Sequence, residues 1–226
     1  MPTGIEPSTL ESDGWTVRVQ PPNDPATAGV LLLLHGWTGD EKVMWIFTRA
    51  LAGRFWMFAP RAPQAVPSGG YAWLPHNEQR WPALEEFQSV TGELLAAYER
   101  WADQAQVPAD IRQRPLDLMG FSQGAAMSFA VAAHYPQRVG RIAALAGFLP
   151  RLAHPPDAAP DSWAPAFRGR RVYVAHGSQD EIVPVRMAHE TVRELQAAGA
   201  DVTFCESDVG HKLAANCLKG LDSFFS

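Results

Sequence analysis

The spacing of apolar residues along the chain predicts a series of β-strands. Apolar and polar side chains alternate along Trp15–Gln20, as in a strand with one buried face. Residues 30–34 and 55–58 are unbroken apolar runs, which are typical of strands in a parallel sheet that is covered on both faces. Shorter apolar segments predict further strands at residues 116–119, 141–146, 172–175 and 202–205.

Helical patterns fall between these predicted strands. The clearest follows Pro82, where apolar residues recur at three- and four-residue spacing from Leu84 to Trp101, as on one face of an amphipathic helix. Strands that alternate with helices indicate an α/β fold, with a mainly parallel central sheet flanked by helices on both faces. In such sheets, ligands bind at the carboxyl ends of the strands. The other helices are predicted at residues 41–51, 123–135, 185–198 and 212–225.

Three segments lack these patterns. Residues 61–77 and 150–165 are rich in proline or glycine and predict irregular loops. Residues 1–14 are polar and predict a loose N-terminal segment. Because the chain shows no internal repeat and has a size common for α/β domains, we expect residues 1–226 to form a single domain.

Composition narrows the class of protein. Apolar residues make up 46% and charged residues 19% of the chain, so it can bury a sizeable core. The net charge of −5 argues against binding to nucleic acid or to an anionic membrane surface. The first residues lack the pattern of a signal peptide, and no apolar run approaches the roughly 20 residues of a membrane helix. We therefore expect a cytoplasmic protein without stable membrane insertion.

The chain has two cysteines, Cys205 and Cys217. Two cysteines cannot form the disulfide framework of a small secreted protein. In a reducing compartment we expect small buried thiols, and a disulfide between them is the alternative. Neither cysteine belongs to a zinc-binding pattern, and the H-E-x-x-H motif is missing from the sequence, so we expect no metal and no cofactor.

The strongest chemical signal is Gly120-Phe-Ser-Gln-Gly124, which matches G-x-S-x-G. It joins the predicted strand 116–119 to the predicted helix 123–135, and a sharp turn there lifts the Ser122 hydroxyl into the cleft. The two glycines leave room for the helix to pass close to its strand. The alternative is a serine that only caps a helix after a glycine-rich turn.

A serine hydroxyl is a weak nucleophile, so it needs a base and an acid that orients the base. In enzymes with this turn, the order along the chain is serine, acid, histidine, with each residue on a loop after a strand. Asp180 ends the segment His176-Gly-Ser-Gln-Asp180, which follows the predicted strand 172–175. His211 follows the predicted strand 202–205.

These assignments have alternatives. Glu181 and Asp208 are rival acids, although the loop position and the His-Gly-x-x-Asp context favour Asp180. The alternative for His211 is an ordinary surface histidine before a helix. His35 and His176 each follow a strand directly, and we expect them to shape the backbone of the next turn.

Acyl transfer also needs two backbone N–H donors that point at one place, the oxyanion hole. One donor is expected from Gln123, the residue after the nucleophile, and the other from the loop 35–39. Within that loop we favour the amide of Trp37, because Gly36 and Gly39 let the backbone turn inward. The alternative is that both glycines serve only the turn.

Aromatic residues are unusually frequent, with 8 Trp and 11 Phe. Most of the tryptophans lie away from the predicted catalytic loops, and we expect them to pack against the sheet. The aromatic and apolar residues that fall near those loops are the candidates for substrate binding, namely Trp37, Tyr71, Trp73, Phe121, Phe148 and Leu149.

Several motifs together resemble the phospholipase/carboxylesterase group of α/β-hydrolases, which includes acyl-protein thioesterases. They are Leu34-His-Gly-Trp-Thr-Gly39, Pro60-Arg-Ala-Pro63, Gly120-Phe-Ser-Gln-Gly124, His176-Gly-Ser-Gln-Asp180 and Gly210-His211. The resemblance runs from about residue 15 to residue 226 and implies an α/β-hydrolase fold with little or no lid and no metal. It also implies Ser122 as nucleophile, His211 as base and Asp180 as the orienting acid. Trp37 departs from the family, whose members often carry a smaller apolar residue there, and so does the loop 69–73.

The resulting hypothesis is a serine carboxylesterase that hydrolyses small to medium acyl esters through an acyl-enzyme intermediate. The first alternative is a thioesterase, lysophospholipase or other α/β-hydrolase with a different substrate class. The second is a non-catalytic binding module, although such a module has no need for all three triad residues in order. We expect a small-molecule ester as ligand and no nucleic-acid partner, and an exposed aromatic patch would favour a homodimer.

Overall fold

The strands of the computed structural model form one eight-stranded sheet and a separate two-stranded hairpin. The structure describes residues 6–75, 80–152 and 163–226. In the large sheet the strands follow the order β1, β2, β4, β3, β7, β8, β9, β10. Their bounds are Ser8–Ser12 (β1), Trp15–Gln20 (β2), Val30–Leu34 (β3), Trp56–Pro60 (β4), Leu116–Phe121 (β7), Val139–Leu145 (β8), Arg171–Gly177 (β9) and Asp201–Ser207 (β10).

The strands from β4 to β10 in this order run parallel, and β1 and β2 add an antiparallel edge. The register pairs Leu34 with Gly120 and Phe121 with Leu145. The carboxyl ends of β3, β7 and β8 therefore meet at one edge of the sheet. This mainly parallel sheet confirms the predicted α/β class.

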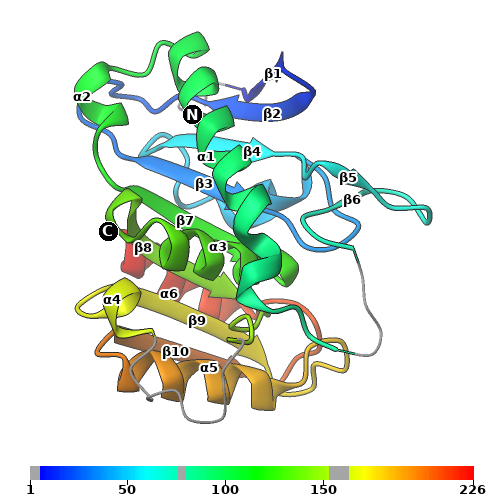
Figure 1. Ribbon diagram of the computed structural model, residues 1–226. Coiled ribbons are helices and arrows are strands. Elements are labelled where there is room, and N and C mark those ends of the chain that lie inside the picture. Colours follow the sequence, from blue (N-terminus) through cyan, green and yellow to red (C-terminus); the bar gives the residue numbers. More distant parts are fainter. Residues whose placement is uncertain (1–5, 76–79, 153–162) are drawn as a thin grey trace.

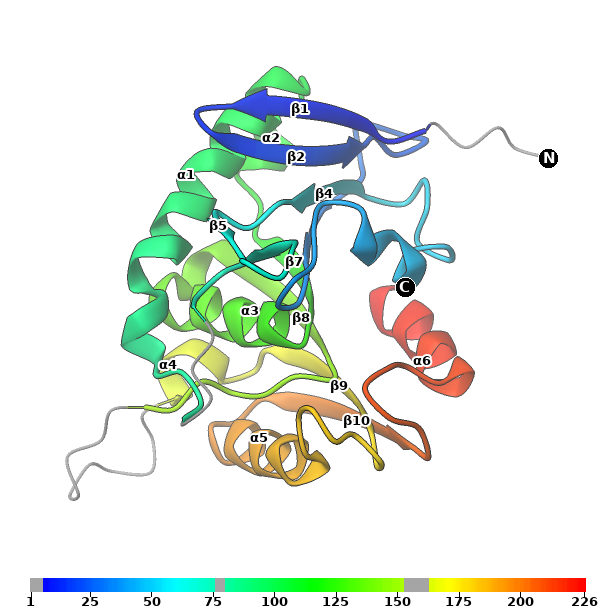
Figure 2. The same ribbon diagram turned by 90° about the vertical axis from the view of Figure 1, so that its right-hand side faces the viewer.

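Helices cover both faces of the sheet. Helices α1 (Gln88–Gln104), α3 (Gln123–His134) and α5 (Val185–Ala197) lie on one face, and α6 (Ala215–Phe225) lies on the other (Figures 1 and 2). The remaining helices are short. They are α2 (Ala109–Arg112), α4 (Ala164–Phe167) and the 3-10 helices Val43–Phe47, Leu84–Phe87 and Pro136–Arg138.

The central strand β3 is buried on both sides. Leu32 and Leu34 belong to the hydrophobic cluster on the side of α1 and α3. Leu31 and Leu33 belong to the cluster on the side of α6. Because successive side chains of a strand point to opposite faces, an unbroken apolar run suits a strand that lies between two cores.

Residues 8–12 are not part of a loose segment, so the prediction for residues 1–14 is wrong there. They form β1, which pairs with β2 through the turn Asp13-Gly14, where φ is 50° at Asp13 and 80° at Gly14. Positive φ at both positions is typical of a type I′ hairpin turn, and Asp-Gly is one of the dipeptides that favour it. Strand β1 itself is polar and largely exposed, so its own pattern does not reveal the pairing. Residues 1–5 lie outside the described part of the chain.

Three other segments differ from the predictions. In place of a helix over residues 41–51, the structure has the 3-10 helix Val43–Phe47, of which Met44 is buried while Ile46 is exposed, so the apolar spacing makes no continuous buried face. The predicted loop 61–77 contains the hairpin of β5 (Gln64–Ala65) and β6 (Tyr71–Ala72). In the predicted loop 150–165, residues 153–162 lie outside the described residues, and α4 begins at its end.

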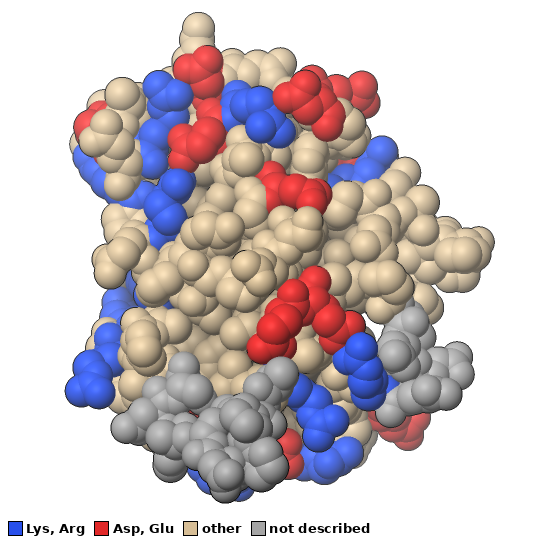
Figure 3. Space-filling model, in the orientation of Figure 1, with Lys and Arg blue, Asp and Glu red and all other residues tan. Residues whose placement is uncertain are grey.

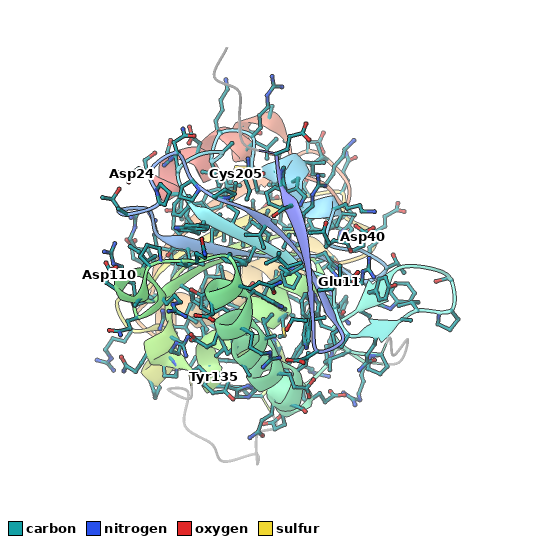
Figure 4. All side chains as sticks on the ribbon, turned by 90° about the horizontal axis from the view of Figure 1, so that it is seen from above. Glu11, Asp24, Asp40, Asp110, Tyr135 and Cys205 are labelled. Carbon is teal, nitrogen blue, oxygen red and sulfur yellow. A yellow bond between two sulfur atoms is a disulfide. The ribbon has the colours of Figure 1, made fainter. Side chains whose placement is uncertain are left out.

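The two cysteines form a disulfide, Cys205–Cys217, so the prediction of free thiols is wrong. Cys205 lies in β10 and Cys217 in α6, and Figure 4 shows Cys205 beside this helix. Apolar spacing along the chain does not show that α6 packs against this strand, so it could not indicate the pairing. Because disulfides persist mainly in oxidising compartments, the cysteines no longer support the expected cytoplasmic location.

Charged side chains of both signs lie on the face of the molecule shown in Figure 3. On the described part of the face in Figure 3, Lys and Arg side chains lie among Asp and Glu side chains. None of the helices in the described ranges is both long enough and apolar enough to cross a bilayer.

Candidate active site

Ser122 lies at a sharp turn between β7 and α3, as the sequence predicts. Its backbone has φ 54° and ψ −118°, a strained conformation for a residue other than glycine. Both glycines of the motif are needed at this turn. A Cβ atom on Gly120 would lie 2.1 Å from the Gly124 carbonyl oxygen, and one on Gly124 would lie 1.9 Å from the Leu34 carbonyl oxygen. The Ser122 amide donates to the Leu145 carbonyl at 2.8 Å, which ties the turn to the end of β8.

Asp180 and His211 lie in direct contact. The Asp180 side chain is fully buried, and its Oδ1 accepts hydrogen bonds from the amides of Ile182 and Val183, each at 2.9 Å. Its Oδ2 lies 2.7 Å from His211 Nδ1. Because an ionised carboxylate can only accept, Nδ1 carries the proton and donates it, and His211 Nε2 is left as an acceptor.

The rival acids lie elsewhere. Glu181 is exposed, and Asp208 accepts a hydrogen bond from the hydroxyl of Ser178 at 3.2 Å. Among these three acids, the structure sets Asp180 against His211.

The His211 ring also lies beside the turn of the serine. It packs against the ring of Phe121, the residue before Ser122, with 4.9 Å between the ring centroids. The loops that carry Asp180 and His211 approach each other closely, because a Cβ atom on Gly177 would lie 2.2 Å from the Gly210 carbonyl oxygen. The glycine of the His-Gly-x-x-Asp segment thus makes this approach sterically feasible.

The loop 35–39 runs directly past the serine. A Cβ atom on Gly36 would lie 3.1 Å from Cβ of Ser122. The loop is held at both ends, because the Trp73 indole Nε1 donates to the His35 carbonyl at 2.7 Å and the Tyr71 amide donates to the Gly39 carbonyl at 2.9 Å. The backbone in which the Trp37 amide is expected to act therefore lies next to Ser122.

The side chain of Gln123 has a role that the sequence analysis missed. It is buried, its Oε1 accepts from the Trp73 amide at 2.9 Å, and its Nε2 donates to the Leu74 carbonyl at 2.9 Å. It therefore ties the start of α3 to the same segment that holds the loop 35–39. A long amide side chain inside an otherwise small-residue helix start was the signal that could have pointed to it.

Two buried histidines support these loops in the neutral form. His35 Nε2 accepts from the Ala62 amide at 3.0 Å, so its Nδ1–H donates to the Gly36 carbonyl at 2.7 Å. His176 donates from Nε2 to the Val183 carbonyl at 2.8 Å, close to Asp180. Burial lowers the pKa of His35 and the pKa of His176. Both contacts agree with the expectation that these residues shape their turns.

The candidate substrate-binding residues divide into two groups by their exposure to solvent. Trp37 is 39% exposed, and Tyr71 and Phe121 are partly exposed. Trp73 is 0% exposed, and Phe148 and Leu149 are also buried, so these side chains belong to the core rather than to an open rim. Substrate contact stays a prediction for the first group.

Other apolar side chains near the site were not predicted. Phe47 stacks on Phe121, with 5.5 Å between the ring centroids. Ile46 and Ile182 are 72% and 65% exposed, and Ile182 lies two residues after Asp180. Such exposed apolar side chains at a site are candidates for contact with an apolar ligand. No group of His, Cys, Asp and Glu side chains in the described ranges could hold a metal ion.

Comparison with known proteins identifies the family of this chain. A sequence model described as Phospholipase/Carboxylesterase matches residues 16–226. The chain belongs to the phospholipase/carboxylesterase family. The resemblance read from the motifs is confirmed, and the protein is a hydrolase that acts on esters.

Curated relatives and solved structures match most of the chain. Esterase YpfH of Escherichia coli (strain K12) is 27% identical over 204 residues, which cover 86% of this chain and 80% of that protein. Acyl-protein thioesterase 1 of Kluyveromyces lactis is 29% identical over 184 residues, covering 75% and 77%. The Bacillus cereus carboxylesterase structure superposes with a TM-score of 0.78 at 19% identity, covering 95% of this chain and 94% of that one. This structural match supports the α/β-hydrolase fold.

Acid is expected to destabilise this esterase. In the unfolded chain, His35 and His176 take up protons near their ordinary pKa of 6.5, whereas burial keeps them neutral in the folded protein. On acidification the unfolded state then binds more protons than the folded state. The contribution of the two neutral histidines to the free energy of unfolding is complete above about pH 6.5 and is lost as pH falls through their lowered pKa. Urea unfolding at a series of pH values measures this loss in the free energy of unfolding. A midpoint that stays constant or rises on acidification contradicts the account.

Trp73→Ala is expected to destabilise the esterase by about 3–5 kcal/mol, because it removes a fully buried indole and its hydrogen bond to His35. Urea unfolding measures the loss. Trp37→Ala is the matched control, since the Trp37 side chain is partly exposed and its removal should cost under about 1 kcal/mol. If Trp73→Ala kept full stability and changed only the preferred acyl length, Trp73 would belong to the pocket after all.

Proposed function

We propose that this family member is a serine carboxylesterase that hydrolyses small to medium acyl esters through Ser122, His211 and Asp180. The observation that carries the proposal is the 2.7 Å contact between His211 Nδ1 and the buried Asp180, with the His211 ring packed beside the turn of Ser122. This arrangement leaves Nε2 of a neutral imidazole as the available base.

Acylation begins when His211 Nε2 takes the proton of the Ser122 hydroxyl as its oxygen attacks the ester carbonyl carbon. Asp180 keeps the imidazole in the required tautomer and stabilises the imidazolium that forms. The negative charge that develops on the carbonyl oxygen is stabilised by the amides of Trp37 and Gln123. The position of Gly36 against Ser122 supports this role for the loop.

The tetrahedral intermediate then collapses. The bond to the alcohol oxygen breaks, and the alcohol leaves with the proton from His211, so that the acyl group stays on Ser122. In the second half, His211 takes a proton from water, which attacks the acyl carbon. The bond between the acyl carbon and Ser122 Oγ then breaks, His211 returns its proton to that oxygen, and the carboxylic acid leaves.

Short and medium acyl groups suit the surroundings of Ser122. Trp37 and Ile182 offer exposed apolar surface on the loops of the site, whereas Trp73, Phe148 and Leu149 already fill the core. A small apolar group can bury itself against the exposed side chains without a deep tunnel. A thioester is the second candidate substrate, because the same attack applies and a relative at 29% identity is an acyl-protein thioesterase.

A series of p-nitrophenyl esters from acetyl to palmitoyl, measured beside the matching acyl thioesters, tests the proposal. We expect the highest kcat/KM for an ester in the acetyl to octanoyl range. A maximum at palmitoyl, or a clear preference for thioesters throughout, would overturn the proposed substrate class. Ser122→Ala protein in every assay provides the background rate.

A further inference from the structure

The disulfide encloses the candidate base. Cys205 lies six residues before His211 and Cys217 six residues after it, and the two are 12 positions apart. The loop that carries His211 is thus closed at its base by a covalent bond between β10 and α6. The sequence analysis gave these cysteines no role.

The elements on either side of the loop, β10 and α6, are also held in place by contacts other than the disulfide. The hydroxyl of Tyr173, in β9, donates to the Cys217 carbonyl at 2.7 Å. Leu221, Phe224 and Phe225 of α6 are buried in the core. Strand β10 pairs with β9 along its whole length. Opening the disulfide should therefore release the loop while the sheet and α6 stay in place.

Hydrogen bonds hold the loop besides the disulfide. The Ser207 hydroxyl donates to Asn216 Oδ1 at 3.0 Å across its base, and the Gln179 amide donates to the Val209 carbonyl at 3.0 Å from the preceding loop. The His211 side chain is fixed by Asp180 and by the ring of Phe121. The rate of proton transfer depends on a position of His211 that is fixed to a fraction of an ångström relative to Ser122. The loss of one covalent constraint on its loop should therefore lower this rate.

The two sulfur atoms are unequally accessible. Cys205 is partly exposed, whereas Cys217 is buried. An attacking thiolate therefore reaches Cys205 Sγ, and the departing electron pair goes to Cys217 Sγ. The Ser207 hydroxyl lies 3.3 Å from Cys217 Sγ, and Asn216 Nδ2 lies 3.7 Å from Cys205 Sγ. The Asn216 side-chain amide can donate to Cys205 Sγ once the bond is broken, whereas the Ser207 hydroxyl donates to Asn216 Oδ1 at 3.0 Å.

We infer that the Cys205–Cys217 disulfide is a redox-modification site through which a dithiol reductant switches ester hydrolysis down. The first thiolate of the dithiol breaks the S–S bond, forms a mixed disulfide with Cys205 and releases the Cys217 thiolate, which takes a proton. The second thiol then attacks its partner sulfur and releases Cys205. Two electrons pass from the dithiol, which becomes a disulfide, to the protein, which gains two thiols. The inference rests on the proposed role of His211 as base.

The test compares the ester hydrolysis of oxidised protein with that of protein treated with dithiothreitol. Thiol alkylation followed by mass spectrometry checks that both cysteines are free in the treated protein. We expect kcat for p-nitrophenyl acetate to fall by about tenfold to a hundredfold, with little change in KM, and to return on reoxidation. The double variant Cys205→Ser/Cys217→Ser should have the low rate and no response to the dithiol. Full activity of protein with both thiols free would overturn the inference.

Hydrogen–deuterium exchange separates this inference from the proposed function. In reduced protein, amide exchange should rise in residues 207–215 and stay unchanged in α1 and α3. Unchanged exchange in residues 207–215 would overturn the redox switch, whatever the activity. If the oxidised protein has no esterase activity, or Ser122→Ala keeps it, the proposed function fails instead, and the switch in ester hydrolysis falls with it.

Discussion

Ser122→Ala is expected to lower ester turnover by at least about 10⁴-fold while leaving the fold unchanged. The variant removes the hydroxyl that attacks the ester but keeps the Cβ atom and the backbone bond to Leu145. Initial rates with p-nitrophenyl acetate measure the effect, and thermal unfolding checks that the variant is folded.

The exposed hydroxyl of Ser89 in α1 provides the control, because it donates to Glu93 and belongs to neither of the loops that carry His211 and Asp180. Ser89→Ala should keep the full rate. If Ser122→Ala retained more than a few per cent of the turnover, another residue would be the nucleophile.

Asp180→Asn is expected to lower kcat by about 10³–10⁴-fold. In the native protein, Oδ1 accepts the amides of Ile182 and Val183, and Oδ2 faces His211 Nδ1. An asparagine would keep its oxygen toward the two amides, so its NH₂ group would face His211. The imidazole would then accept at Nδ1 and carry its proton on Nε2, where it cannot take the proton of Ser122.

The rival acids give matched controls for this variant. Asp208→Asn and Glu181→Gln each remove one charge near the same loops but leave the contact between Asp180 and His211. Both should keep kcat within a factor of about three. A large loss in Asp208→Asn together with a small loss in Asp180→Asn would mean that the orienting acid has been wrongly assigned.

Local patterns were sufficient to predict every strand of the large sheet except β1. Trp15–Gln20 and Val30–Leu34 were predicted with the bounds that the structure has. Their patterns are simple because β3 lies between two cores, whereas β2 shows its alternation near an edge. The motif around Ser122 was also readable, since the chemistry of a strand–turn–helix restricts the residues along one short segment.

Features that depend on distant segments could not be predicted in this way. Trp73 was expected at the rim, but its indole reaches His35 from another loop and is buried there. The side chain of Gln123 bonds to residues about fifty positions away. The disulfide depends on how α6 packs against β10. Each of these requires the tertiary arrangement, which apolar spacing along one segment does not contain.

The excess of aromatic residues is now partly explained. Trp15, Trp73 and Trp101 are buried in the core, and the rings of Trp15 and Trp101 pack edge to face with 5.5 Å between centroids. Trp37 remains as the exposed aromatic side chain of the loop beside Ser122. The composition therefore reflects large core side chains more than a wide aromatic pocket.

The central claim is that Ser122 is a nucleophile activated by His211 and Asp180. Labelling with a fluorophosphonate probe, followed by peptide mass spectrometry, tests it most directly, because the probe forms a covalent bond with an activated serine. We expect one adduct, on Ser122, that is lost in Ser122→Ala and forms far more slowly in Asp180→Asn. An adduct on another residue, or no adduct on folded protein, would contradict the account.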